Sequence, residues 1–74
     1  MREETVEITT EYIKLDQLLK FSGIAMTGAE AKEMILSGMV SVDGETCVMR
    51  GKKIRPGNSV EVETADGQIT VRIS

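Results

Sequence analysis

The stretch that decides the fold is T-G-A-E-A-K-E-M-I-L-S-G-M-V-S-V-D-G, from Thr27 to Gly44. Thr27, followed three residues later by Glu30, forms the capping-box pattern that begins a helix. Gly38 is the residue type that most often follows the end of one. Asp43-Gly44 then predicts a tight turn between antiparallel strands. The stretch therefore predicts a short capped helix that leads at once into a hairpin.

The segment before this unit predicts one strand and one helix. Residues 5–12 alternate between apolar and polar positions, which is the period of a half-buried strand. From Leu15 the apolar spacing changes to three and four residues, as in Leu15, Leu18 and Leu19. We expect this helix to end at Gly23.

The segment after the unit predicts further strands and turns. Residues 46–49 are expected to form the returning strand of the first hairpin, and a loop follows over residues 50–57. Pro56-Gly57 fits a tight turn, and Asp66-Gly67 predicts the turn of a second hairpin. The predicted fold class is α+β, with two short helices packed on a small, mostly antiparallel sheet and an extra C-terminal hairpin.

Length and composition restrict the classes of protein that the chain can belong to. Its 74 residues predict a single domain over residues 1–74, which buries about 60% of the surface of the unfolded chain. No apolar run reaches the length of roughly 18 residues that crosses a bilayer, and the polar N-terminus does not resemble a signal peptide. We expect a cytoplasmic protein that does not enter a membrane. Because Cys47 is the only cysteine, no intrachain disulfide is possible.

The charge is unevenly distributed along the chain. The net charge is −3, yet residues 12–60 carry a charge of +2, and both ends are acidic. Four cations fall within six residues and have no acid among them, namely Arg50, Lys52, Lys53 and Arg55. Such a run is often only a solvated loop. In an acidic protein it gains most if an anion binds there, and a phosphate backbone is the expected anion.

The sequence gives little support to catalysis or to metal binding. It has no histidine, one cysteine and no evident base at triad-like spacing. Zinc prefers clusters of Cys and His, and Asp43-Gly44-Glu45 lacks the spacing of a calcium loop. We therefore expect no enzymatic activity, no metal, no cofactor and no small-molecule substrate.

The start of the second predicted helix has two possible roles. Thr27-Gly28 can serve as a helix cap alone, or its free backbone amides can accept a phosphate. Lys32, one turn further on, lies on the side of the helix and adds its charge. The sequence leaves both roles open.

Four segments together resemble a known family. They are K-L-D-Q-L-L (14–19), T-G-A-E-A-K-E-M-I (27–35), G-M-V-S-V-D-G (38–44) and I-R-P-G-N-S-V-E-V (54–62). Their order and spacing resemble the small RNA-binding domain named after ribosomal small-subunit protein four, also called the alpha-L motif. The short length and the R-G-K-K-I-R-P-G segment look most like its stand-alone bacterial YaaA-type branch. The family-like core covers about residues 12–62.

This resemblance implies a non-enzymatic, ribosome-associated module that binds RNA, with structured ribosomal RNA as the expected ligand, in ribosome assembly or translation. The residues expected to contact RNA are Lys14, Thr27, Gly28, Lys32, Arg50, Lys52, Lys53 and Arg55. Two positions depart from the family pattern. Gly28 stands where many members have arginine, and Asp43 stands where a turn asparagine is frequent. Both departures reduce the attraction for phosphate.

A different class of function also fits the sequence. A protein-interaction module would use the half-exposed Leu36, the acidic ends of the chain or an unpaired edge of the C-terminal hairpin. Charge reversal at Lys52 and Lys53 separates the two readings, because it abolishes RNA binding but leaves binding to a protein partner largely intact.

Overall fold

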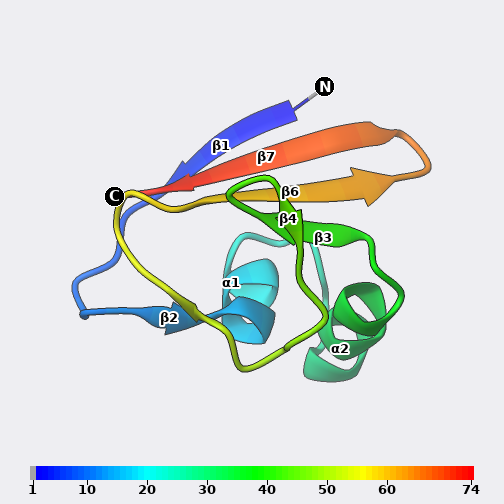
Figure 1. Cartoon of the computed structure of the whole chain (residues 1–74), viewed down its shortest axis with the longest axis horizontal. Coiled ribbons are helices and arrows are strands. Elements are labelled where there is room, and N and C mark those ends of the chain that lie inside the picture. The colour runs from blue at the N-terminus through cyan, green and yellow to red at the C-terminus, as the bar shows by residue number, and fades with distance from the viewer. Residues whose placement is uncertain (1) are drawn as a thin grey trace.

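The protein is described here by a computed structural model that covers residues 2–74. The elements in chain order are β1 (Arg2–Val6), β2 (Ile13–Lys14), α1 (Leu15–Phe21), α2 (Gly28–Leu36), β3 (Val40–Val42), β4 (Glu45–Thr46), β5 (Lys53–Ile54), β6 (Ser59–Thr64) and β7 (Gly67–Ile73). The strands form a five-stranded sheet in the order β1-β7-β6-β3-β4 and a two-stranded sheet of β2 and β5. The predicted α+β fold class is confirmed (Figure 1).

Both helices lie on one face of the five-stranded sheet (Figure 1). The inward sides of the helices contribute leucine, alanine and isoleucine, and the sheet contributes mainly valine. The fully buried side chains include Leu15, Leu18, Leu19, Ile35, Val60, Val62 and Val71. This aliphatic core holds the sheet and the two helices in one arrangement. Within residues 2–74, neither helix has the length and apolar character needed to cross a membrane.

The helix ends follow the predictions from sequence. The backbone N–H of Glu30 donates to Thr27 Oγ1 at 3.1 Å, so Thr27 caps α2 as the motif predicts. Gly38 follows the end of α2 at a φ of +82°, a left-handed conformation that favours glycine. The turn at Asp43-Gly44 joins β3 to β4, and Asn58 N donates to Arg55 O at 3.0 Å around the Pro56-Gly57 turn.

The predicted strand over residues 5–12 is wrong in its bounds. The first strand covers Arg2–Val6 and runs parallel to β7, with Val6 opposite Ile73 as the last pair. Ser74 N then donates to Val6 O at 2.9 Å, and Ile8 N donates to Ser74 O at 3.0 Å. Because β7 ends at Ile73, residues 7–12 have no strand beside which to continue.

Two further expectations need correction. The returning strand predicted over residues 46–49 is shorter, because β4 ends at Thr46 and the next three residues leave the sheet. The C-terminal hairpin of β6 and β7 is present, but among residues 2–74 neither of its strands is an outer strand of the sheet. Its strands pair with β3 on one side and β1 on the other. The outer strands of the five-stranded sheet are instead β1 and β4.

Candidate nucleic-acid interface

The two-stranded sheet places two of the predicted cations next to each other. Ile13 pairs with Ile54 and Lys14 pairs with Lys53 in antiparallel register. Ile54 is fully buried, so the alternation of the strand puts Lys53 on the outer face. Side chains directly opposite each other in such a pair have Cβ atoms about 4.5–5.5 Å apart. The fold therefore holds two lysine residues opposite each other at the surface.

The segment of residues 50–55, which we call the basic segment, is fixed to the start of α1 by backbone hydrogen bonds. Leu15 N donates to Lys52 O at 2.9 Å, and Asp16 N donates to Arg50 O at 3.1 Å. These bonds satisfy two of the amide groups that the first turn of a helix leaves without partners. The backbone at Arg50 and Lys52 therefore has a defined position, although both side chains are exposed.

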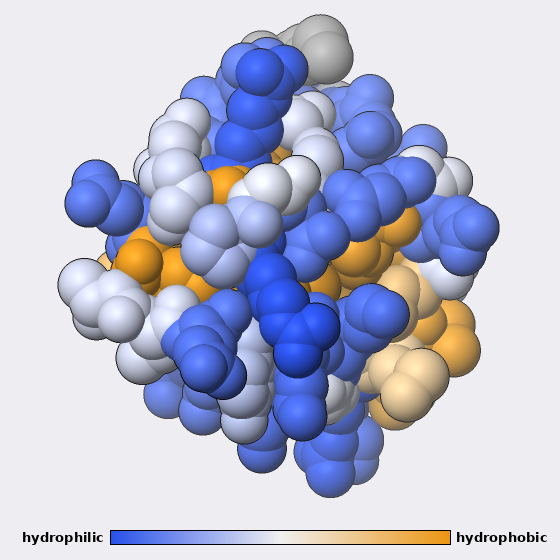
Figure 2. All heavy atoms as spheres, turned by 60° about the vertical axis from the view of Figure 1, so that its left-hand side comes forward, coloured by the Kyte–Doolittle hydropathy of each residue, from blue (hydrophilic) through white to orange (hydrophobic). Residues whose placement is uncertain are grey.

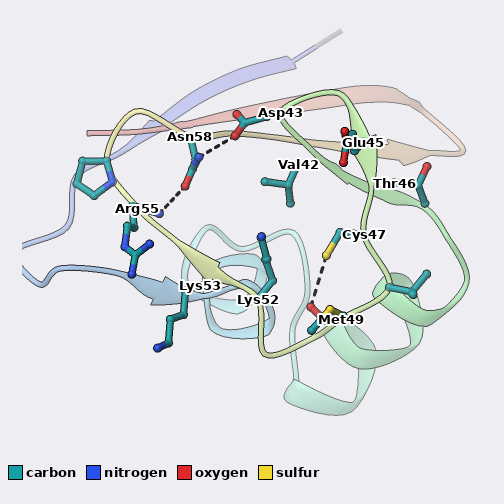
Figure 3. Close-up of a pocket in the computed structure, with 12 residues that line it drawn as sticks. Val42, Asp43, Glu45, Thr46, Cys47, Met49, Lys52, Lys53, Arg55 and Asn58 are labelled. Atoms are coloured by element: carbon teal, nitrogen blue, oxygen red, sulfur yellow. Dashed lines mark hydrogen bonds between the residues drawn. The ribbon is translucent and has the colours of Figure 1, made fainter.

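Asn58 connects the end of the basic segment to the β3–β4 turn (Figure 3). Its Oδ1 accepts from Arg55 N at 2.7 Å, and its Nδ2 donates to Asp43 Oδ2 at 2.7 Å. The other oxygen of Asp43 accepts from Ser59 N at 2.9 Å. Asp43 has a φ of +50°, a conformation that aspartate and asparagine adopt more readily than most residues. The Asp43 carboxylate therefore joins the β3–β4 turn to Asn58 and Ser59, in addition to carrying a negative charge.

An open hollow of about 740 Å³ lies between the β3–β4 hairpin and the basic segment. Three of the predicted cations line it, namely Lys52, Lys53 and Arg55. The opposite wall includes Val42, Cys47, Val48 and Met49. In Figure 3 the amine of Lys52 points across the hollow toward Val42, whereas Lys53 and Arg55 project away from it. The hollow thus combines an inward cation, outward cations, an apolar wall and the carboxylates of Asp43 and Glu45.

The cations of this region have no ion-pair partners among residues 2–74. The two ion pairs of the described residues are Arg2 with Glu4, within β1, and Arg72 with Glu3, between β7 and β1. The amine of Lys53 lies 5.0 Å from the centre of the Tyr12 ring, a cation–π contact that leaves its charge uncompensated. Seen from the side that carries β2, most surface side chains are hydrophilic, and hydrophobic ones show at the left, the centre right and the lower right (Figure 2).

The other predicted contact residues lie outside this hollow. Thr27, Gly28 and Lys32 belong to the start and the side of α2, and all three are exposed. Nothing lies within 4 Å of the position where a Cβ on Gly28 would stand, so the approach to the helix start is open. The eight predicted residues therefore form two groups, one on α2 and one around β2 and the basic segment.

Sequence reasoning missed three residues of the site. Val48 and Met49 are 52% and 66% exposed, although the strand predicted over residues 46–49 assigned them to a sheet. Because β4 ends at Thr46, these apolar side chains stand beside the basic segment instead. Asn58 was also missed. Its place directly after Pro56-Gly57 was the available signal, because asparagine side chains commonly bond to the backbone of turns.

Comparison with known proteins identifies the family. The profile of the S4 domain matches residues 6–72, which is most of the chain. The chain belongs to the S4 domain family. This S4 domain is 36% identical over 58 residues to a protein of Bacillus subtilis (strain 168) named probable ribosome maturation protein RlbA. The match covers 78% of this chain and 82% of that relative. The predicted resemblance to a family of RNA-binding domains is thereby confirmed.

Proposed function

We propose that this S4 domain is a non-enzymatic module that binds structured ribosomal RNA in the cytoplasm and acts in ribosome assembly or translation. The family and the name of the Bacillus relative support this proposal. The structural observation that carries it is the pairing of Lys14 with Lys53 on an exposed surface. We name Lys14, Lys53 and Arg55 the outer basic face.

The outer basic face has the properties expected of a phosphate-binding surface. Like charges directly opposite each other on neighbouring strands destabilise a sheet. An anion that binds between them offsets this repulsion, and RNA offers anions at regular spacing along its backbone. Lys52 and Arg50 add positive charge from the same segment, and Lys32 with the amides at Thr27-Gly28 forms a second contact on α2.

Recognition of RNA shape fits the composition of the surface. The chain has two aromatic residues, Tyr12 and Phe21, so stacking of many successive bases on aromatic rings is not its mode of binding. Folded RNA offers phosphates and 2′-hydroxyl groups across a wide minor groove, which proteins recognise largely by shape. A structured RNA such as ribosomal RNA is therefore the ligand that the surface favours.

The test is crosslinking in cells of the source organism, followed by sequencing of the RNA recovered with the protein. The test variant carries Lys14→Glu and Lys53→Glu, and the control carries Arg2→Glu and Arg72→Glu. Both variants change the net charge equally and alter exposed side chains. We expect a defined ribosomal RNA site for the wild type and the control, and its loss in the test variant. Featureless recovery from all three proteins would contradict the proposal.

A protein-interaction module is the alternative function, and the structure offers it one specific surface. Strand β1 is an outer strand of the five-stranded sheet. Among the described residues, no strand pairs with its outer side, so a partner protein can add a strand there. Such pairing would rest on the backbone groups of β1, because Glu3 and Glu4 are ion-paired with Arg72 and Arg2. If this is the function, the Lys14/Lys53 variant keeps its protein partner, and the Arg2/Arg72 variant changes it.

A further inference from the structure

We propose that the hollow between the β3–β4 hairpin and the basic segment receives one unpaired nucleotide that projects from an RNA helix. This inference rests on the proposed function and adds a specific feature of the RNA to it. The outer basic face would bind the backbone of the helix, and the hollow would bind the projecting nucleotide.

The size of the hollow suits a single nucleotide. Its volume of about 740 Å³ lies within the range of about 300–1,000 Å³ that is typical of sites for small ligands. It is open to solvent along one side, so a nucleotide that remains attached to its strand can enter. A base-paired helix cannot place the face of a base there, because its paired bases are stacked on one another.

The cations are arranged for a ligand with one part inside the hollow and one part outside it. The amine of Lys52 points into the hollow, while Lys53 and Arg55 point away from it (Figure 3). This follows from the alternation of the extended chain, which puts Lys52 on the same side as the buried Ile54. Lys52 is therefore placed to contact the phosphate or a carbonyl oxygen of an inserted nucleotide.

The apolar wall supplies a surface for the face of the base. Val48 and Met49 are large apolar residues that the fold leaves more than half exposed at the rim of the hollow. The thioether of methionine is polarisable and makes favourable contacts with aromatic rings. Without an aromatic residue among those that line the hollow, this wall is the surface on which a base can rest.

Polar groups near the same wall can form hydrogen bonds with the edge of the base. Glu45 and Thr46 line the hollow, and within residues 2–74 the carboxylate of Glu45 makes no ion pair. A carboxylate accepts hydrogen bonds from an exocyclic amino group such as that of cytosine. A projecting cytidine is therefore a suitable probe nucleotide.

The test compares two RNA hairpins that differ in one nucleotide, because the second carries a single unpaired cytidine inserted into an otherwise identical, fully paired stem. Affinities are measured by fluorescence anisotropy for the wild type, a Val48→Ser/Met49→Ser variant and a Leu36→Ser control. Leu36 is a suitable control because it is 56% exposed on α2 and does not line the hollow. We expect the wild type and the control to prefer the hairpin with the unpaired cytidine by about tenfold, which is the upper end of what contacts between a methionine sulfur and a ring supply. The Val48/Met49 variant should lose this preference and keep its affinity for the paired hairpin.

The outcomes separate the two proposals. Equal affinity of the wild type for both hairpins would overturn the nucleotide site and leave RNA binding in place. The same conclusion follows if the Val48/Met49 variant retains the full preference. If the wild type binds neither hairpin nor ribosomal RNA, the proposed function itself is overturned, and this inference with it.

Discussion

The five-stranded sheet and the two-stranded sheet differ in whether their basic side chains have acidic partners. At the β1–β7 edge, Arg2 lies 3.0 Å from Glu4 and Arg72 lies 3.5 Å from Glu3, so each cation has an acidic partner. In the two-stranded sheet, Lys14 stands opposite Lys53 with no acidic partner among the described residues. The same chain therefore neutralises its cations in one region and leaves them free in the other.

Because of this difference, the net charge alone does not describe the surface that a ligand would meet. The net charge of −3 alone would argue against a ligand with many phosphates. The exposed pairs at the β1–β7 edge contribute about 0–1 kcal/mol each to stability. The cations of the two-stranded sheet gain no such energy from pairing within the described residues. The predictions below test whether the two regions are as separate as this comparison implies.

The largest expected effect comes from the residue that anchors the two-stranded sheet. Ile54→Ala removes a fully buried side chain and should lower the free energy of unfolding by about 2–4 kcal/mol. Ile73→Ala removes the same atoms from a nearly buried position on β7 and should have an effect of similar size. Urea denaturation measures both losses.

RNA affinity distinguishes these two variants. At a temperature where both remain folded, the Ile54 variant should bind RNA more weakly, because Lys53 and Arg55 flank the position. The Ile73 variant should bind RNA as the wild type does. Equal affinities for the two variants would show that the outer basic face does not depend on its anchor.

The next largest expected effect comes from removing one of two similar hydrogen bonds, each of which joins a side-chain amide to a carboxylate. Asn58 donates to Asp43 beside the basic segment, and Gln68 donates to Glu61 within the hairpin of β6 and β7. Asn58→Ala should lower the free energy of unfolding by about 1–2 kcal/mol, because the bond to Arg55 N is lost as well. It should also weaken RNA binding, whereas Gln68→Ala should leave RNA binding unchanged. An unchanged RNA affinity of the Asn58 variant would contradict a role for this bridge in placing Arg55.

The local elements of the fold can be predicted from the sequence, whereas the pairing of distant segments cannot. The helices, the cap of α2 and the turns at Asp43-Gly44 and Pro56-Gly57 were predicted correctly, because each depends on residues within a few positions of one another. Thr27 with Glu30 and Pro56 with Gly57 are examples. The second hairpin turns at Ala65-Asp66, one residue before the predicted Asp66-Gly67. The pairing of β1 with β7 was not predicted, because it joins the two ends of the chain and no local pattern encodes it.

The same distinction applies to the candidate site. The basic residues were predicted from composition and from the family resemblance, and their role in RNA binding stays a prediction. The position of Lys14 opposite Lys53 was not predicted, because strands of two residues give no periodic signal. The link from Asp43 to Asn58 also joins distant residues, so the sequence showed only the unfavourable charge of Asp43.

The smallest expected effect comes from removing one acid beside the hollow. Glu45→Gln removes a negative charge from the hollow beside the basic segment, and within residues 2–74 the Glu45 side chain makes no ion pair. The affinity for a fully paired RNA should rise by about twofold to fivefold at low salt. Glu3→Gln removes the same charge at the β1–β7 edge and should change the affinity little. A fluorescence titration in low salt measures both effects, and a larger gain from the Glu3 variant would contradict the separation of the two regions.

The most direct measurement of the central claim is the dependence of RNA affinity on salt concentration. If about five phosphates are neutralised, log affinity should fall with log salt at a slope of about −4. Lys14→Gln with Lys53→Gln should make this slope shallower by about 1.5, while Arg2→Gln with Arg72→Gln should leave it unchanged. A wild-type affinity that is independent of salt, or a slope that becomes shallower only in the Arg2/Arg72 variant, would contradict the assignment of RNA binding to the outer basic face.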